Sequence, residues 1–142
     1  MSDGNAELVS AAFDAWNRRD LDALLALCEP DVVVRSLMTE AERAIYDGAP
    51  GVRDWLESVL DVFPDWQPIP RWVDDYGDAL VVCFHVNATA RNSGIPLDQD
   101  FWLAARLSEA GRLRFWGFFR TEELAREAAG VGGYGRPMSS TR

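Results

Sequence analysis

Residues 97–120, LDQDFWLAARLSEAGRLRFWGFFR, constrain the fold most, because two apolar, aromatic stretches are joined there by a short turn at 109–111. Strongly apolar stretches on either side of a short, glycine-containing turn are typical of an antiparallel β-hairpin. Phe101, Trp116 and Phe118 fall at alternating positions in the two stretches. The segment therefore predicts a long hairpin near the end of the domain that forms one wall of a pocket.

Helical patterns dominate the first half of the chain. The first 29 residues carry two of them, the second capped by Asp20 and ended by Pro30. The β-branched run at 31–38 predicts a strand, and residues 50–63 carry the apolar face of a third helix. The stretch between that strand and the third helix is polar, so we expect it to be irregular.

The second half of the chain changes to a period of two. This alternation predicts consecutive antiparallel strands near residues 67–74, 79–91, 97–108 and 112–120. A short last helix follows, capped by Thr121 and ended by Gly130. We therefore expect one domain over residues 1–130 and a Gly/Ser-rich, mobile tail over 131–142.

Charge and hydropathy limit the expected partners. The chain has 14 Lys and Arg against 23 Asp and Glu, a formal net charge of -9, which opposes binding to a phosphate backbone. No apolar run approaches the roughly 20 residues that cross a bilayer, and the first residues do not resemble a secretion signal. We expect a soluble, cytoplasmic protein that binds neither nucleic acid nor membrane.

Metal or cofactor chemistry has little support in the sequence. Cys28 and Cys83 lie far apart without CxxC spacing, and His85 is the single histidine. One histidine without an HxH or HExxH pattern is weak evidence for a metal site. We therefore expect no metal ion and no cofactor, and two reduced cysteines that serve in packing.

Helices followed by a meander of strands predict an α+β domain in which helices cover one face of a curved antiparallel sheet. The chain also carries NRRDLDAL at the end of the helical region, EPD before the first strand, YDG and FPD around the third helix, and EAGR before the last strand. In order and spacing over residues 6–130 these motifs resemble the SnoaL-like branch of the NTF2-like (cystatin-like) fold, which includes polyketide cyclases and ketosteroid isomerases. The resemblance implies a cone with an apolar cavity, and a homodimer formed through the outer sheet face.

Side-chain parity assigns faces to the predicted strands. The even positions of 82–90 are all apolar and should face the interior, which places His85 outside. On the next strand the odd positions of 101–105 should face inward, leaving Asp98 and Asp100 outside, where a carboxylate costs least. A β-bulge would reverse the assignment of His85. The functional alternative for the two aspartates is a paired acid/base site.

The predicted pocket lining combines aromatic and aliphatic residues with one serine: Trp16, Ser36, Trp55, Trp72, Phe84, Val86, Phe101, Leu103, Trp116 and Phe118. The tryptophans fit an ordinary core as well. The candidate catalytic residues are Arg120 and Tyr46, as donors to a developing oxyanion. Arg120 could instead pair with a nearby acid, and Tyr46 could simply close the mouth of the cavity.

The resemblance also implies what the cavity lacks. Relatives keep acids or a tyrosine at positions that match Ser36, Ala12, Leu103 and Phe118, and none of these four side chains accepts a proton near neutral pH. Three functions therefore stay open. They are a cofactor-free isomerase, cyclase or lyase acting on a polycyclic, aromatic or terpenoid-like compound, a non-catalytic ligand-binding or dimerisation module, and an epoxide hydrolase.

Overall fold

The protein is described by a computed structural model over residues 3–36 and 44–131. In chain order the elements are α1 (Asp3–Asn17), α2 (Leu21–Leu25), β1 (Cys28–Ser36), β2 (Ala44–Asp47), α3 (Gly48–Val62), β3 (Pro68–Asp75), β4 (Ala79–Thr89), β5 (Pro96–Leu107), β6 (Leu113–Phe119) and α4 (Glu122–Ala129).

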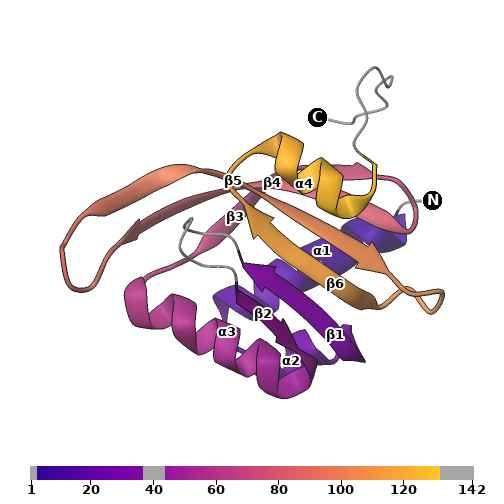
Figure 1. Cartoon of the computed structure of the whole chain (residues 1–142), viewed down its shortest axis with the longest axis horizontal. Helices are drawn as coiled ribbons and strands as arrows, with labels where there is room; N and C mark the ends of the chain where they lie inside the picture. Colours follow the sequence, from indigo (N-terminus) through magenta and orange to yellow (C-terminus); the bar gives the residue numbers. More distant parts are fainter. Residues whose placement is uncertain (1–2, 37–43, 132–142) are drawn as a thin grey trace.

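The strands form one six-stranded sheet in the order β2-β1-β6-β5-β4-β3. Strands β3 to β6 are consecutive antiparallel neighbours, whereas β1 pairs with β6 in parallel and carries β2 on its outer edge. Figure 1 shows the sheet curving around the helices at the start of the chain. The predicted α+β class, with a curved and mainly antiparallel sheet, is confirmed.

The two faces of the sheet carry separate hydrophobic clusters. Helices α1, α2 and α3 pack on the inner face, where the larger cluster includes Phe13, Trp55 and Phe84. Helix α4 packs on the outer face over a smaller cluster that includes Ala104 and Phe119 (Figure 1). Burial of apolar side chains on both faces is the main stabilising term of such a domain.

The parity assignment of the strands is confirmed. Val82 and Phe84 on β4, and Phe101 and Ala105 on β5, belong to the inner cluster, while Ala104 belongs to the outer one. The register pairs these residues without a bulge along the whole β4–β5 ladder. The interior faces of β4 and β5 could therefore be assigned from the alternation alone.

Three helix ends lie where the sequence predicts them. The Asp20 carboxylate accepts a hydrogen bond from the Ala23 amide, 3.1 Å, at the start of α2. The Thr121 hydroxyl accepts from the Leu124 amide, 3.2 Å, at the start of α4. Gly130 ends α4 in the left-handed region at φ 78°, a conformation that glycine adopts without steric cost.

The region between α1 and α3 differs from the prediction. Helix α2 ends at Leu25, and the strand begins at Cys28, so that Pro30 lies inside β1 and does not end a helix. Residues 44–47, predicted to be irregular, form β2 and pair with β1, Val34 opposite Tyr46. Pairing with the preceding strand outweighs the weak local pattern here. The predicted strand end at 37–38 and the tail beyond 131 lie outside the described residues.

Helix α4 is held on the outer face by a buried ion pair. The Arg126 guanidinium donates to the Asp74 carboxylate, to Glu122 at 2.9 Å and to the Tyr76 hydroxyl at 2.6 Å. Asp74 is only 1% exposed, so its charge depends on this partner. Although burial works to lower the pKa of Arg126, the hydrogen bonds to Asp74, Glu122 and Tyr76 outweigh burial and raise it.

Candidate functional site

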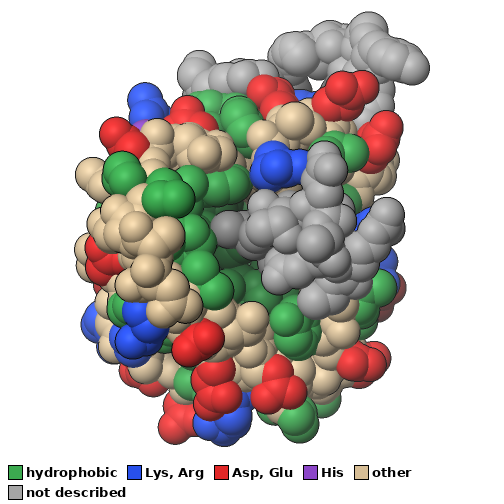
Figure 2. Space-filling model, turned by 60° about the vertical axis from the view of Figure 1, so that its left-hand side comes forward, with side chains coloured by type: hydrophobic (Ala, Val, Ile, Leu, Met, Phe, Trp, Pro, Cys, Tyr) green, Lys and Arg blue, Asp and Glu red, His purple; other side chains and the backbone are tan. Residues whose placement is uncertain are grey.

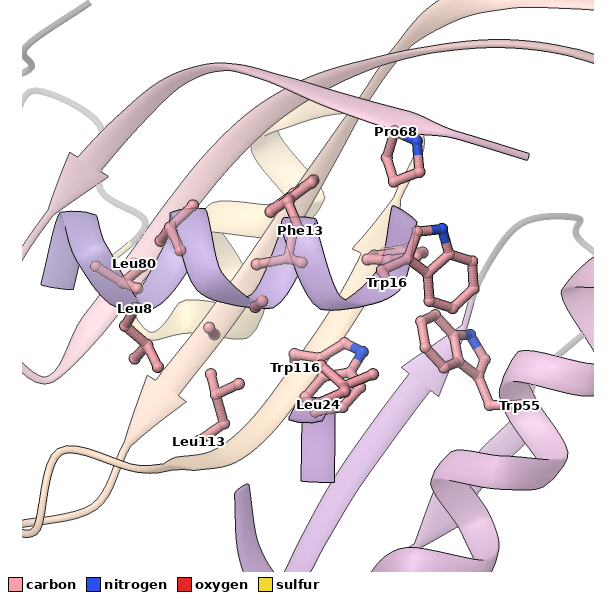
Figure 3. Close-up of a pocket in the computed structure, with 14 residues that line it drawn as sticks. Leu8, Phe13, Trp16, Leu24, Trp55, Pro68, Leu80, Leu113 and Trp116 are labelled. Carbon is pink, nitrogen blue, oxygen red and sulfur yellow. The ribbon is translucent and has the colours of Figure 1, made fainter. Parts of the chain in front are cut away.

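A cavity of about 50 Å³ lies between the inner face of the sheet and helices α1, α2 and α3. Figure 2 shows one face of the molecule with a hollow whose floor is hydrophobic, and Figure 3 shows the lining residues. The lining is entirely apolar or aromatic: Leu8, Val9, Ala12, Phe13, Trp16, Leu24, Trp55, Pro68, Leu80, Leu103, Ala105, Leu113, Trp116 and Phe118.

Helix α1 supplies one wall of the cavity through its periodicity. Leu8, Ala12 and Trp16 recur every four residues, and Val9 and Phe13 occupy the neighbouring row. Residues three or four apart share one face of a helix, so this stripe points at the sheet along the length of α1. The outward positions on the same helix, such as Ala11, are exposed.

Trp55 on α3 packs against aromatic side chains of α1 and β6. Its ring centroid lies 4.8 Å from that of Trp16, 5.6 Å from Trp116 and 5.1 Å from Phe118. The close approach of α3 to β2 depends on Gly51, because a Cβ atom there would lie 2.8 Å from the Tyr46 carbonyl carbon. Gly51 precedes Trp55 by four residues, about one helical turn, so the two residues lie on the same face of α3.

Ionisable side chains are absent from the cavity lining within the described part of the chain. The polar atoms at the cavity belong to tryptophans. Trp16 and Trp55 are 5% and 2% exposed, and the indole Nε1 of each is buried without a hydrogen-bond partner among the described residues. Indole N–H is a donor and never an acceptor. The described lining therefore offers no acid, base or nucleophile.

The structure brings together half of the residues predicted to line the cavity. Trp16, Trp55, Leu103, Trp116 and Phe118 are in the lining. Three others, Phe84, Val86 and Phe101, belong to the same buried cluster but lie behind the lining. Ser36, at the end of β1, is the register partner of Phe118 on β6. The side chain of Ser36 lies outside the described part of the structure.

The prediction for Trp72 needs correction. The β3–β4 register shifts between Pro70 and Trp72, so that Pro70 opposes Phe84 while Trp72 opposes Cys83, on the outer face. Trp72 accordingly packs against the outer cluster and does not line the cavity. An extra residue in one strand inverts the side-chain parity beyond it.

The two candidate catalytic residues lie apart from the cavity lining. Arg120 follows the last residue of β6 and is exposed. Tyr46 is half-buried and packs against the inner cluster from the edge strand β2, with Val34 as its register partner. Neither residue is in the lining of the cavity as described.

His85, Asp98 and Asp100 form a cluster on the outer face, as parity predicts. The Nδ1 of His85 lies 2.8 Å from Asp100 and its Nε2 lies 2.6 Å from Asp98. Both nitrogens donate only when the ring is protonated, and the hydrogen bonds to Asp100 and Asp98 raise the pKa of His85. Arg71 lies 3.5 Å from Asp100. These aspartates therefore point away from the cavity, which opposes epoxide hydrolysis.

Several lining residues were not predicted from the sequence. Leu8, Val9, Ala12 and Phe13 could have been assigned from the helical stripe of α1, since all of them fall on its apolar face. Ala105 could have been assigned from the alternation of β5, which places it on the inner face. The remaining lining residues come to the cavity through the tertiary arrangement: Leu24, Pro68, Leu80 and Leu113.

Among the described residues, no group of three or more His, Cys, Asp or Glu side chains is placed so that it could hold a metal ion. Within the same residues, none of the helices has both the length and the apolar character needed to cross a bilayer.

Comparison with protein families and solved structures identifies similar domains. A family model described as a SnoaL-like domain matches residues 9–123. An NTF2-like protein of unknown function from Burkholderia pseudomallei is 21% identical, with 89% of this chain and 97% of that chain covered and a TM-score of 0.75. TerC, co-crystallized with polyporic acid, is 19% identical over 89% of this chain and 97% of that chain, with a TM-score of 0.72.

A putative SnoaL-like polyketide cyclase from Jannaschia is also 19% identical, over 92% of this chain and 94% of that chain, with a TM-score of 0.71. At these identities the solved structures establish a common fold and no common chemistry. No curated protein is similar enough in sequence to count as a match.

Proposed function

Because the chain belongs to the SnoaL-like family, we propose that it binds a small, uncharged and mainly apolar molecule inside the cone. The observation that carries this proposal is the lining, which contains no ionisable side chain among the described residues. Concave, mostly apolar cavities are the usual sites for small molecules. A non-catalytic binding module fits such a lining better than an acid–base enzyme, which needs a proton donor or acceptor at the substrate.

The volume of the cavity limits the ligand. An engineered apolar cavity of roughly 150 Å³ holds benzene, and drug-sized pockets measure roughly 300–1,000 Å³. The cavity of this chain holds about 50 Å³. A compound with one small ring therefore requires the least movement of the lining, whereas a polycyclic or terpenoid compound requires lining side chains to rotate or helices to shift.

Neighbouring residues on α1 provide the test. Ala12 lines the cavity, and Ala11 is exposed on the same helix. Ala12→Leu adds three carbon atoms to the cavity lining, and Ala11→Leu adds the same atoms on the solvent side. We expect wild type and Ala11→Leu to bind methylenecyclohexane, as followed by NMR titration, and Ala12→Leu to lose that binding. Equal binding by both variants would place the ligand elsewhere and contradict the proposal.

A cofactor-free isomerase, cyclase or lyase is the second candidate, because one structurally similar protein is described as a putative SnoaL-like polyketide cyclase. Catalysis would then depend on holding a reactive conformer and on oxyanion stabilisation by Arg120 and Tyr46. Both residues lie outside the described lining, so the substrate would have to reach past it. Unchanged turnover in Arg120→Met and Tyr46→Phe would exclude this role.

We also propose a homodimer through the part of the outer sheet face that α4 leaves uncovered. Ile69 supports this proposal, because it is 55% exposed on β3, opposite His85. Ile69→Asp should shift sedimentation toward the monomer, whereas Val62→Asp, at an exposed position of α3, should not. A wild-type monomer at high concentration would contradict the proposal.

A further inference from the structure

Helix α1 covers the cavity along its whole length. Figure 3 shows Leu8 of α1 near one end of the cavity and Trp16 near the other. Among the described elements, the backbone of α1 comes close only to α2 and β3. Lining residues come from α1 on one side and from β4, β5 and β6 on the other. The space between α1 and these three strands is therefore the cavity itself, and the height of α1 above them sets its volume.

Several contacts hold the C-terminal end of α1 in place. The Asn17 amide donates to the Pro68 carbonyl, 3.0 Å, at the start of β3. Arg19, just beyond the helix, donates to the Trp66 carbonyl, 2.8 Å. The aromatic rings in this half of the helix also pack against rings of β4 and α3. This end of α1 is therefore fixed to β3, to the segment before β3 and to the aromatic part of the core.

Asn5 holds the N-terminal end of α1 at the opposite end of β3. Its amide donates to the Asp75 carboxylate, 2.9 Å, and to the Gly77 carbonyl, 3.0 Å. The Asp75 carboxylate also accepts from the Gly77 amide, 2.8 Å, so the turn after β3 keeps a hydrogen bond of its own when Asn5 is replaced. Leu8 and Val9, which line the cavity in this half of the helix, are aliphatic. Loss of the Asn5 amide therefore releases this end of α1 and leaves the contacts at the other end intact.

We propose that Asn5 is a positioning residue that limits the size of the ligand, because it holds the end of α1 near Leu8 down on β3. This inference rests on the binding function proposed above. The cavity holds about 50 Å³, so a compound with two fused rings needs that end of α1 to rise, whereas a single ring needs little movement. The apparent affinity for the larger compound is reduced by the fraction of protein in the raised state. Loss of the Asn5 hydrogen bonds increases that fraction and so strengthens binding of the larger compound.

The test compares benzene and naphthalene, which have one and two aromatic rings. Both are titrated, with NMR detection, into wild type, Asn5→Ala, Asn5→Asp and Ser10→Ala. Asn5→Asp keeps the shape of the side chain but removes the donor, and an acidic residue suits the first turn of a helix, so this variant does not weaken α1 itself. Ser10→Ala is the matched control, because it removes a polar side chain from an exposed position of the same helix.

We expect the affinity for naphthalene relative to benzene to rise about 3- to 10-fold in both Asn5 variants, the net effect of the lost hydrogen bonds, and to stay constant in Ser10→Ala. A general loss of stability strengthens binding of neither ligand. In Asn5→Ala, NOEs from naphthalene should reach Leu8 and Leu80, at the end of the cavity that opens. Bound benzene with an unchanged or lower ratio in a folded Asn5 variant would overturn the role of Asn5 alone. Failure of benzene to bind wild type would overturn the proposed function and this role together.

Discussion

Replacement of Trp55 by alanine should both weaken the fold and enlarge the cavity. The indole is 2% exposed, lines the cavity and lies within 5.6 Å of three other aromatic rings, measured between centroids. Loss of a buried tryptophan costs about 3–5 kcal/mol, the transfer free energy of the ring plus the cost of the void. For a chain of this size each kcal/mol lowers Tm by about 3–5 °C, so we expect a fall of roughly 10–20 °C.

The void left by Trp55 should accept the ring that was removed. Indole bound only by the folded state stabilises it by about 2.7 kcal/mol at 100 times its Kd, which would recover much of the lost Tm. The assay is thermal unfolding with and without indole in wild type, Trp55→Ala and Trp102→Ala. Indole should stabilise Trp55→Ala far more than the other two. A loss below about 1 kcal/mol, or no rescue by indole, would refute the assignment of Trp55 to the cavity wall.

Three further predictions concern groups outside the cavity. Arg126→Met leaves the buried Asp74 carboxylate without its cation and should lower the free energy of unfolding, measured by urea denaturation, by about 3–5 kcal/mol. An effect under about 1 kcal/mol would show that this ion pair does not hold α4 on the sheet. The NMR signal of His85 should titrate with a pKa above the ordinary 6.5, and the pKa should move back toward 6.5 in Asp100→Asn. Protonated His85 therefore stabilises the folded state fully below pH 6.5, and this contribution is lost as the pH rises through the folded-state pKa. Burial raises the pKa of Cys28 to about 12, so its thiol should not react with a disulfide reagent at pH 8 until the protein unfolds. Rapid labelling of Cys28 in the native protein would contradict this burial.

The sequence predicted the features that depend on local periodicity. The alternation in β4 and β5 placed Leu103 inside and His85 outside, and the register confirms both faces. The helical spacing of α1 placed Trp16 on an inward face, and the caps at Asp20 and Thr121 mark real helix starts. Each of these features depends on residues within a few positions of one another.

Features that depend on how the strands pair were not predictable in this way. Strand β2 exists because residues 44–47 pair with β1, and three apolar residues in a row, Ala44 to Tyr46, are too few to indicate a strand by themselves. Trp72 faces outward because of one irregularity in the β3–β4 register, which side-chain parity cannot detect. The volume of the cavity depends on how α1 and α3 approach the sheet, and a close backbone contact at Gly51 fixes part of that distance.

The most direct test of the central claim is the position of a bound apolar probe. Intermolecular NOEs should connect the protons of methylenecyclohexane to Leu103 and Phe118 of the lining, and none should reach Phe119, which lies beside Phe118 in sequence but on the outer face. NOEs confined to the cavity residues are the predicted result. NOEs to the outer cluster, or saturable binding without any NOE to the lining, would contradict the assignment of the cavity as the binding site.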